Sequence, residues 1–167
     1  KKGFTFLAGL EAVSQLEGKA SRVVALMNSE EFDLGVAVEQ AVRLLSRNPR
    51  GFFLMVESNN HFTDARKTLD RTVTFDRIIR QVAGLRKDDS LILCTADHSY
   101  GLRMPSGNQK ADILSLVKVE NHHAAEEVLV SADGPGAERV RGIVPNTYLF
   151  QVMLSAYGWK VESERRK

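Results

Sequence analysis

Short apolar runs alternate with longer polar stretches along this chain. Four runs, at residues 4–8, 22–27, 52–56 and 91–96, are too short for helices and predict strands. The last two are almost continuously apolar, as is typical of strands buried on both faces of a parallel sheet. Each of these two runs ends at an acid, Glu57 and Asp97 respectively.

Two stretches carry the stripe of an amphipathic helix. Apolar residues recur at spacings of three and four between Leu34 and Leu45, and Asn48-Pro49 and Gly51 end that pattern. A longer stripe ends at Leu85, and Asp64 is suited to cap the start of its helix.

The second half of the chain differs from the first in composition, with more turn-forming residues. Residues 100–121 predict an excursion beyond the sheet, because residues 100–109 are rich in Gly, Pro, Ser and Asn. Within that half we expect strands at residues 113–119 and 127–131, the first interrupted at residues 120–123. A turn at residues 134–136, a short helix at 137–141, a helix from Asn146 to Ala156 and a charged tail at 160–167 complete the prediction.

This order of elements predicts an α/β fold with a mostly parallel sheet and helices on both faces. The length of 167 residues suits one domain, or a fragment of a larger one. We expect a fragment, because the chain begins with Lys1 and enters directly at a strand. A sheet that lacks part of its strands exposes an edge, which predicts association as a homodimer.

Composition narrows the classes of function. The net charge is +2 and basic residues are scattered among acids, so nothing indicates a nucleic-acid partner. The single cysteine, Cys94, excludes an intrachain disulfide. No apolar run approaches the length of a transmembrane segment, and no signal sequence is visible.

The candidate chemistry lies where the strands end. Asp97 and His98 follow the apolar run directly, at the edge where open α/β sheets carry their sites. All four histidines are predicted after strands or in loops, and together with nearby acids they supply the donors that zinc and magnesium use. The alternative is a scatter of surface polar residues.

The order of motifs resembles the alkaline phosphatase family. Residues 51–57, Gly-Phe-Phe-Leu-Met-Val-Glu, resemble the strand that ends in the family's magnesium-binding glutamate. Residues 95–99, Thr-Ala-Asp-His-Ser, resemble its Asp-His zinc pair, and residues 123–128 resemble the segment that starts with its last zinc-binding histidine. The resemblance spans residues 22–158 and implies an alkaline phosphatase-like fold with two zinc sites and one magnesium site. It implies as ligands Glu57, Asp97, His98 and His123.

One zinc site departs from the family pattern. The family has an Asp five residues after the glutamate and a His four residues further, but this chain has Phe62 and Arg66 there. The nearest donors are His61 and Asp64, whose spacing of three places two side chains on one helical face. They are our candidates for that zinc; the alternative makes Asp64 a helix cap and His61 an exposed loop residue. Because adjacent side chains of an extended segment point to opposite faces, His122 is expected in a supporting or surface role.

The resemblance also implies a reaction, the hydrolysis of phosphate monoesters by a zinc-activated serine. No Asp-Ser-Ala-type nucleophile segment precedes the matched region, so we expect this chain to supply C-terminal metal ligands and to be inactive alone. Two alternatives stay open: another hydrolase of the same superfamily, such as a phosphodiesterase or a sulfatase-like enzyme, and a non-catalytic metal-binding domain with a decayed site. The family is mostly extracytoplasmic, which implies a periplasmic or extracellular location.

Overall fold

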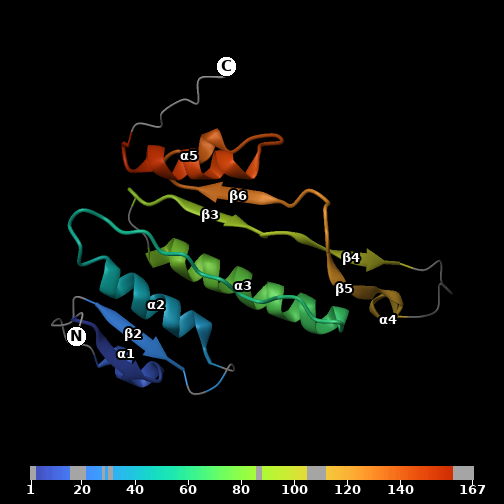
Figure 1. Cartoon of the computed structure of the whole chain (residues 1–167), viewed down its shortest axis with the longest axis horizontal. Coiled ribbons are helices and arrows are strands. Elements are labelled where there is room, and N and C mark those ends of the chain that lie inside the picture. The colour runs from blue at the N-terminus through green and yellow to red at the C-terminus, as the bar shows by residue number, and fades with distance from the viewer. Residues whose placement is uncertain are drawn as a thin grey trace. The chain divides into compact units, whose positions relative to one another are not determined.

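The computed structural model describes residues 3–15, 22–27, 29, 32–85, 88–104 and 112–159 (Figure 1). These residues belong to two compact units. The first comprises residues 1–59 and 72–85, and the second comprises residues 60–71 and 86–167. The charged tail predicted at 160–167 and residues 105–111 of the predicted excursion lie outside the described residues.

The first unit contains a parallel strand pair and two helical segments. Strand β1 (Thr5–Ala8) pairs in parallel with β2 (Val23–Leu26), and the short helix α1 (Leu10–Ser14) lies between them in the chain. Helix α2 (Leu34–Leu45) and residues 72–85 of helix α3 (Ala65–Leu85) complete the unit. These elements confirm the strands predicted near residues 4–8 and 22–27 and both amphipathic helices.

The core of this unit lies between α2 and α3. Val38 and Val42, one helical turn apart on α2, are buried together with Ile78 of α3. Helix α2 starts at Asp33, whose Oδ1 accepts a hydrogen bond from the backbone N–H of Val36 at 3.0 Å. The predicted apolar stripe therefore does face a core, and the two helices lie side by side in Figure 1.

The segment at residues 52–56 is not a strand, contrary to the sequence prediction. It forms no ladder with any strand of the described chain, although its side chains alternate between half-buried and exposed. Phe52, Leu54 and Val56 pack on the α2–α3 core, so the alternation reflects packing against helices rather than pairing within a sheet. Without this central strand, the strands of the described residues do not join into the predicted mostly parallel sheet.

The second unit contains two antiparallel strand pairs. Strand β3 (Ile92–Thr95) pairs with β6 (Val130–Asp133), and β4 (Ser99–Arg103) pairs with β5 (Lys118–Ala124). Helix α4 (Ile113–Leu116), the 3₁₀ turn η1 (Ala137–Arg139) and helix α5 (Asn146–Ala156) complete the unit. The described strands therefore form three two-stranded sheets, of which only β1–β2 is parallel.

Two further predictions in this unit were wrong. Residues 113–116 are helical rather than extended, because Asp112 caps them through the N–H of Leu114 at 3.2 Å. Residues 120–123 continue β5 instead of interrupting a strand. Residues 100–103 of the predicted excursion form β4, which pairs with β5 in a sheet separate from β3–β6. Both belong to one hairpin-like ribbon, a long-range pairing that local composition does not reveal.

No helix of the described residues is long and apolar enough to cross a membrane.

Candidate metal centre

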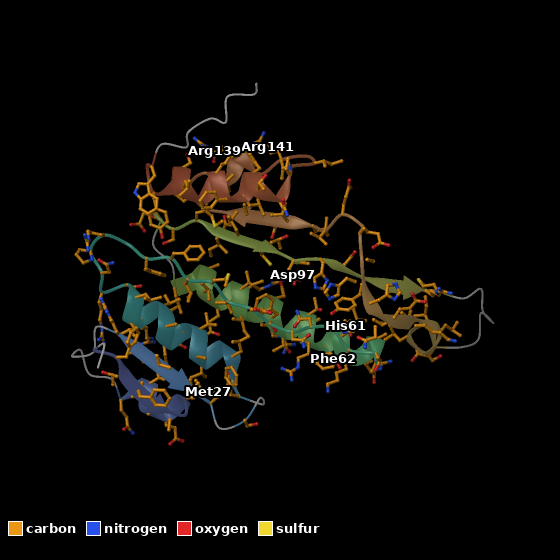
Figure 2. All side chains as sticks on the ribbon, in the orientation of Figure 1. Met27, His61, Phe62, Asp97, Arg139 and Arg141 are labelled. Carbon is orange, nitrogen blue, oxygen red and sulfur yellow. The ribbon has the colours of Figure 1, made fainter. Side chains whose placement is uncertain are left out.

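The strand β3 carries the Asp-His pair just beyond its end, as predicted. Asp97 follows β3 and is exposed, whereas His98 is half-buried and leads directly into β4 (Figure 2). The Oδ2 atom of Asp97 lies 3.2 Å from Nε2 of His98. Two ligands of one tetrahedral zinc ion, each at 2.0–2.1 Å, stand about 3.3 Å apart, so this pair has the separation of a zinc half-site.

The backbone fixes the tautomer of His98. Its Nδ1 lies 3.2 Å from the carbonyl oxygen of Ser99, and a carbonyl oxygen only accepts, so Nδ1 donates its proton. The other nitrogen, Nε2, then faces a carboxylate that also only accepts. This approach is favourable only with a proton on Nε2 or with a cation between the two atoms. A backbone carbonyl that holds one imidazole nitrogen is the usual support of a metal-binding histidine.

Three more rings gather around His98. The rings of His98 and His123 stack with centroids 3.8 Å apart, and the ring of His61 stacks on Tyr100 at 3.5 Å. Tyr100 in turn meets the edges of His98 and His123, at 5.0 Å and 5.3 Å. We call His61, His98, Tyr100 and His123 the histidine cluster.

The sequence reasoning missed Tyr100, although a signal was present. His98 and Tyr100 are two residues apart in extended backbone, which places them on one face. The antiparallel register then sets Tyr100 directly opposite His123. The β4–β5 pairing thus brings together residues that are more than twenty positions apart in the chain.

The first turn of α3 uses Asp64 as its cap. Its Oδ1 accepts hydrogen bonds from the N–H groups of Arg66 at 2.8 Å and Lys67 at 3.1 Å. These are the second and third residues of the helix, the usual partners of an N-cap. The predicted helix cap is therefore confirmed, while the role of Asp64 as a zinc ligand stays a prediction.

The two residues that replace the usual family ligands have other partners. Lys67 Nζ lies 4.3 Å from the centre of the Phe62 ring, a cation–π distance, and Arg71 stands 5.9 Å from the same ring. Arg66 pairs with Asp112 at 3.1 Å, with both side chains mostly exposed. Phe62 thus lies among cations where an aspartate is usual in the family.

The remaining predicted ligand belongs to the first unit. Glu57 follows the extended segment at residues 52–56 and is exposed, whereas the other five predicted ligands lie in the second unit. Among the described residues no three His, Cys, Asp or Glu side chains are placed to hold one ion. What the structure brings together is accordingly one carboxylate–imidazole pair, Asp97 and His98, with His123 stacked on His98.

One carboxylate near the cluster has a shifted pKa. The hydroxyl of Ser99 donates a hydrogen bond to Oε2 of Glu126 at 2.7 Å, and this bond lowers the pKa of Glu126 below its usual value. The nearby His122 lowers that pKa further through its charge.

Comparison with known proteins supports the resemblance seen in the motifs. The family described as alkaline phosphatase matches residues 5–122. A membrane-bound alkaline phosphatase of Bombyx mori is 30% identical over 144 residues, which are 81% of this chain and 26% of that protein. The alkaline phosphatase of Escherichia coli K12 is 27% identical over 76% of this chain and 32% of its own length. The chain thus spans about a quarter to a third of these relatives.

Solved structures show the same fold. The alkaline phosphatase of the Antarctic bacterium TAB5 superimposes with a TM-score of 0.73 at 22% identity, over 95% of this chain and 53% of that one. A variant of the TAB5 enzyme with bound Mg superimposes with a TM-score of 0.72. The alkaline phosphatase-like fold predicted from the motifs is confirmed at this level.

Proposed function

The chain belongs to the alkaline phosphatase family, and from this we propose that it forms the metal-binding part of a phosphate monoesterase. The observation that carries the proposal is the half-site formed by Asp97 and His98, with its zinc-like donor separation of 3.2 Å. The family match supports the same reading independently of the geometry.

In this proposal each predicted ligand has a role. Asp97 and His98 bind one zinc ion. His123, the last histidine of the motif, supplies a further zinc-binding imidazole from β5. Glu57 binds magnesium, the metal named for a variant of the TAB5 enzyme. When bound, zinc supplies a Lewis acid that stabilises charge on a phosphoryl group.

The protein's own residues prepare this half-site. The carbonyl of Ser99 holds the proton on Nδ1 of His98, so that Nε2 presents its lone pair toward Asp97. Stacking of His98 on His123, and the edge contacts of Tyr100, limit the rotation of both imidazoles. The folded chain therefore restricts the conformations of these ligands before a metal binds, which lowers the entropy lost on binding.

The second zinc site, at His61 and Asp64, is the weaker part of the proposal. Asp64 already accepts two hydrogen bonds from the start of α3, and His61 lies flat against Tyr100. The serine nucleophile is proposed to belong to a further part of the intact protein. We also propose a phosphate monoester as the substrate, a homodimer, and a periplasmic or extracellular location, in keeping with the family.

The test is metal content and hydrolysis in the intact protein carrying Asp97→Ala. We expect zinc bound at the half-site to be lost and turnover of a phosphate ester to fall at least about 100-fold. Asp89→Ala is the matched control, because Asp89 precedes the same strand at its other end and lies outside the histidine cluster. Near-normal zinc content and turnover in Asp97→Ala would refute the assignment.

A second candidate function is a non-catalytic metal-binding domain. It is favoured by Phe62 and Arg66, which stand in place of the usual zinc ligands and have cationic and acidic partners of their own. Removal of zinc with a chelator separates the two functions. It abolishes hydrolysis in the enzyme, and it only lowers the thermal stability of the binding domain.

A further inference from the structure

The β4–β5 ribbon carries a second group of donors outside the histidine cluster. Its register pairs Tyr100 with His123 and then Leu102 with Val119, so a single residue of β4, Gly101, faces three residues of β5. Such a bulge changes the directions of the side chains on the longer strand. It brings Glu120 and His122 toward each other over Gly101.

The contacts of this bulge are specific. The Oε2 atom of Glu120 lies 3.4 Å from Nε2 of His122. The other carboxylate oxygen, Oε1, pairs with Nε of Arg103, which fixes the orientation of the carboxylate. His122 is largely exposed, with 60% of its side chain accessible, so a dissolved ion can reach the pair.

Gly101 provides the space in which the two donors meet. A Cβ atom at this position would lie 2.8 Å from Glu120 Oε2 and 2.8 Å from His122 Nε2. That distance is far inside van der Waals contact, so a larger residue would displace the ends of these two flexible side chains. The lack of a side chain at buried Gly101 therefore lets the two donor atoms come together. A small ligand would bind at the point where they converge.

We propose that Glu120 and His122 bind a divalent cation of the zinc type, at a site separate from Asp97 and His98. The donor separation of 3.4 Å matches the value of about 3.3 Å for two ligands of one tetrahedral zinc. Water completes the coordination, since the described residues offer no third His, Cys, Asp or Glu in reach. Arg103 acts as the supporting partner that orients the ligating carboxylate.

The local charge favours a cation at this point. Arg103 neutralises Glu120, and Glu126 lies close enough to His122 to sense its charge. Two carboxylates, those of Glu120 and Glu126, therefore lie near His122 together with one guanidinium, that of Arg103. A bound cation is attracted by this excess of carboxylates.

The site would act on the histidine cluster through the strand. His122 and His123 are neighbours with different contacts: His122 meets Glu120, whereas His123 stacks on His98. A cation at Glu120 and His122 fixes the bulge and, with it, the register that holds His123 beside His98. The site stabilises the β4–β5 ribbon that carries both His122 and His123.

The test is calorimetric titration of the full chain with Zn²⁺. In the Asp97→Ala variant, which lacks the first half-site, we expect a remaining binding event that His122→Ala abolishes. Gly101→Ala should weaken this event about tenfold, because its Cβ displaces both donor atoms. Asn121→Ala is the matched control, since Asn121 lies on the same bulge and is exposed, and it should bind like the parent.

Nuclear magnetic resonance of the imidazole nitrogens supplies a second readout. Zn²⁺ should shift Nε2 of His122 in the Asp97→Ala variant, even if Gly101→Ala proves unstable. The proposal is overturned if Asp97→Ala binds no Zn²⁺, or if His122→Ala binds it with unchanged stoichiometry and affinity. The proposed function fails separately, through unchanged zinc and turnover in Asp97→Ala of the intact protein.

Discussion

Asp64 offers the sharpest separation between a structural role and a role in metal binding. The structure gives its Oδ1 two hydrogen bonds, from the N–H groups of Arg66 and Lys67. Asp64→Ala removes both bonds and leaves these groups to water. Loss of an N-cap costs about 0.5–2 kcal/mol, and loss of the negative charge at a helix start costs about 0.3–1 kcal/mol.

The matched variant is Asp64→Asn. Its side-chain oxygen accepts the same two hydrogen bonds, and Asn caps a helix about as well as Asp. Only the interaction of charge with the helix dipole is lost, so Asp64→Asn should cost about 0.3–1 kcal/mol, less at high salt. The larger penalty of Asp64→Ala should be nearly independent of salt apart from that charge contribution.

Hydrogen exchange measures this local effect best, because the chain contains two units and need not unfold in one step. We expect the amides of the first turn of α3 to exchange about 5–50-fold faster in Asp64→Ala, and only slightly faster in Asp64→Asn. In the intact protein both variants should also lose the zinc ion proposed at His61 and Asp64, because neither Ala nor Asn supplies a carboxylate ligand. Unchanged exchange in Asp64→Ala would refute the capping role, and unchanged zinc content in both variants would remove Asp64 from the proposed ligands.

Two further predictions concern the core of the first unit and the acid near the cluster. Ile78→Ala removes one of three buried residues between α2 and α3 and should destabilise that unit by about 2–4 kcal/mol in urea denaturation, and a loss below about 0.5 kcal/mol would contradict the packing. Ser99→Ala removes the hydrogen bond to Glu126, so the pKa of that carboxyl should rise toward its usual value in a titration followed by NMR. Because the folded pKa of Glu126 is lowered, its contribution to stability is present above the usual pKa and is lost as the pH falls through the folded value; this acid-range loss should shrink in Ser99→Ala, and an unchanged titration would contradict the assigned cause.

Local patterns in the sequence were sufficient to predict the helices α2 and α3 and the position of the Asp97-His98 pair. The stripe from Leu34 to Leu45 and the cap at Asp64 depend on neighbours within one or two turns, and both are confirmed. The Asp97-His98 pair was also predictable, because it follows its strand directly. The order of the motifs identified the family, since that order survives wherever the chain folds in the same way.

Only the tertiary structure determined which distant segments and side chains contact each other. Residues 52–56 have the composition of a central strand, yet they pack on the core between α2 and α3 and pair with no strand of the described chain. The register of β4–β5 places Tyr100 beside His123 in the histidine cluster. The bulge in the same strand pair places Glu120 beside His122. Backbone pairing between distant segments sets such contacts, and a single sequence carries no local signal of register.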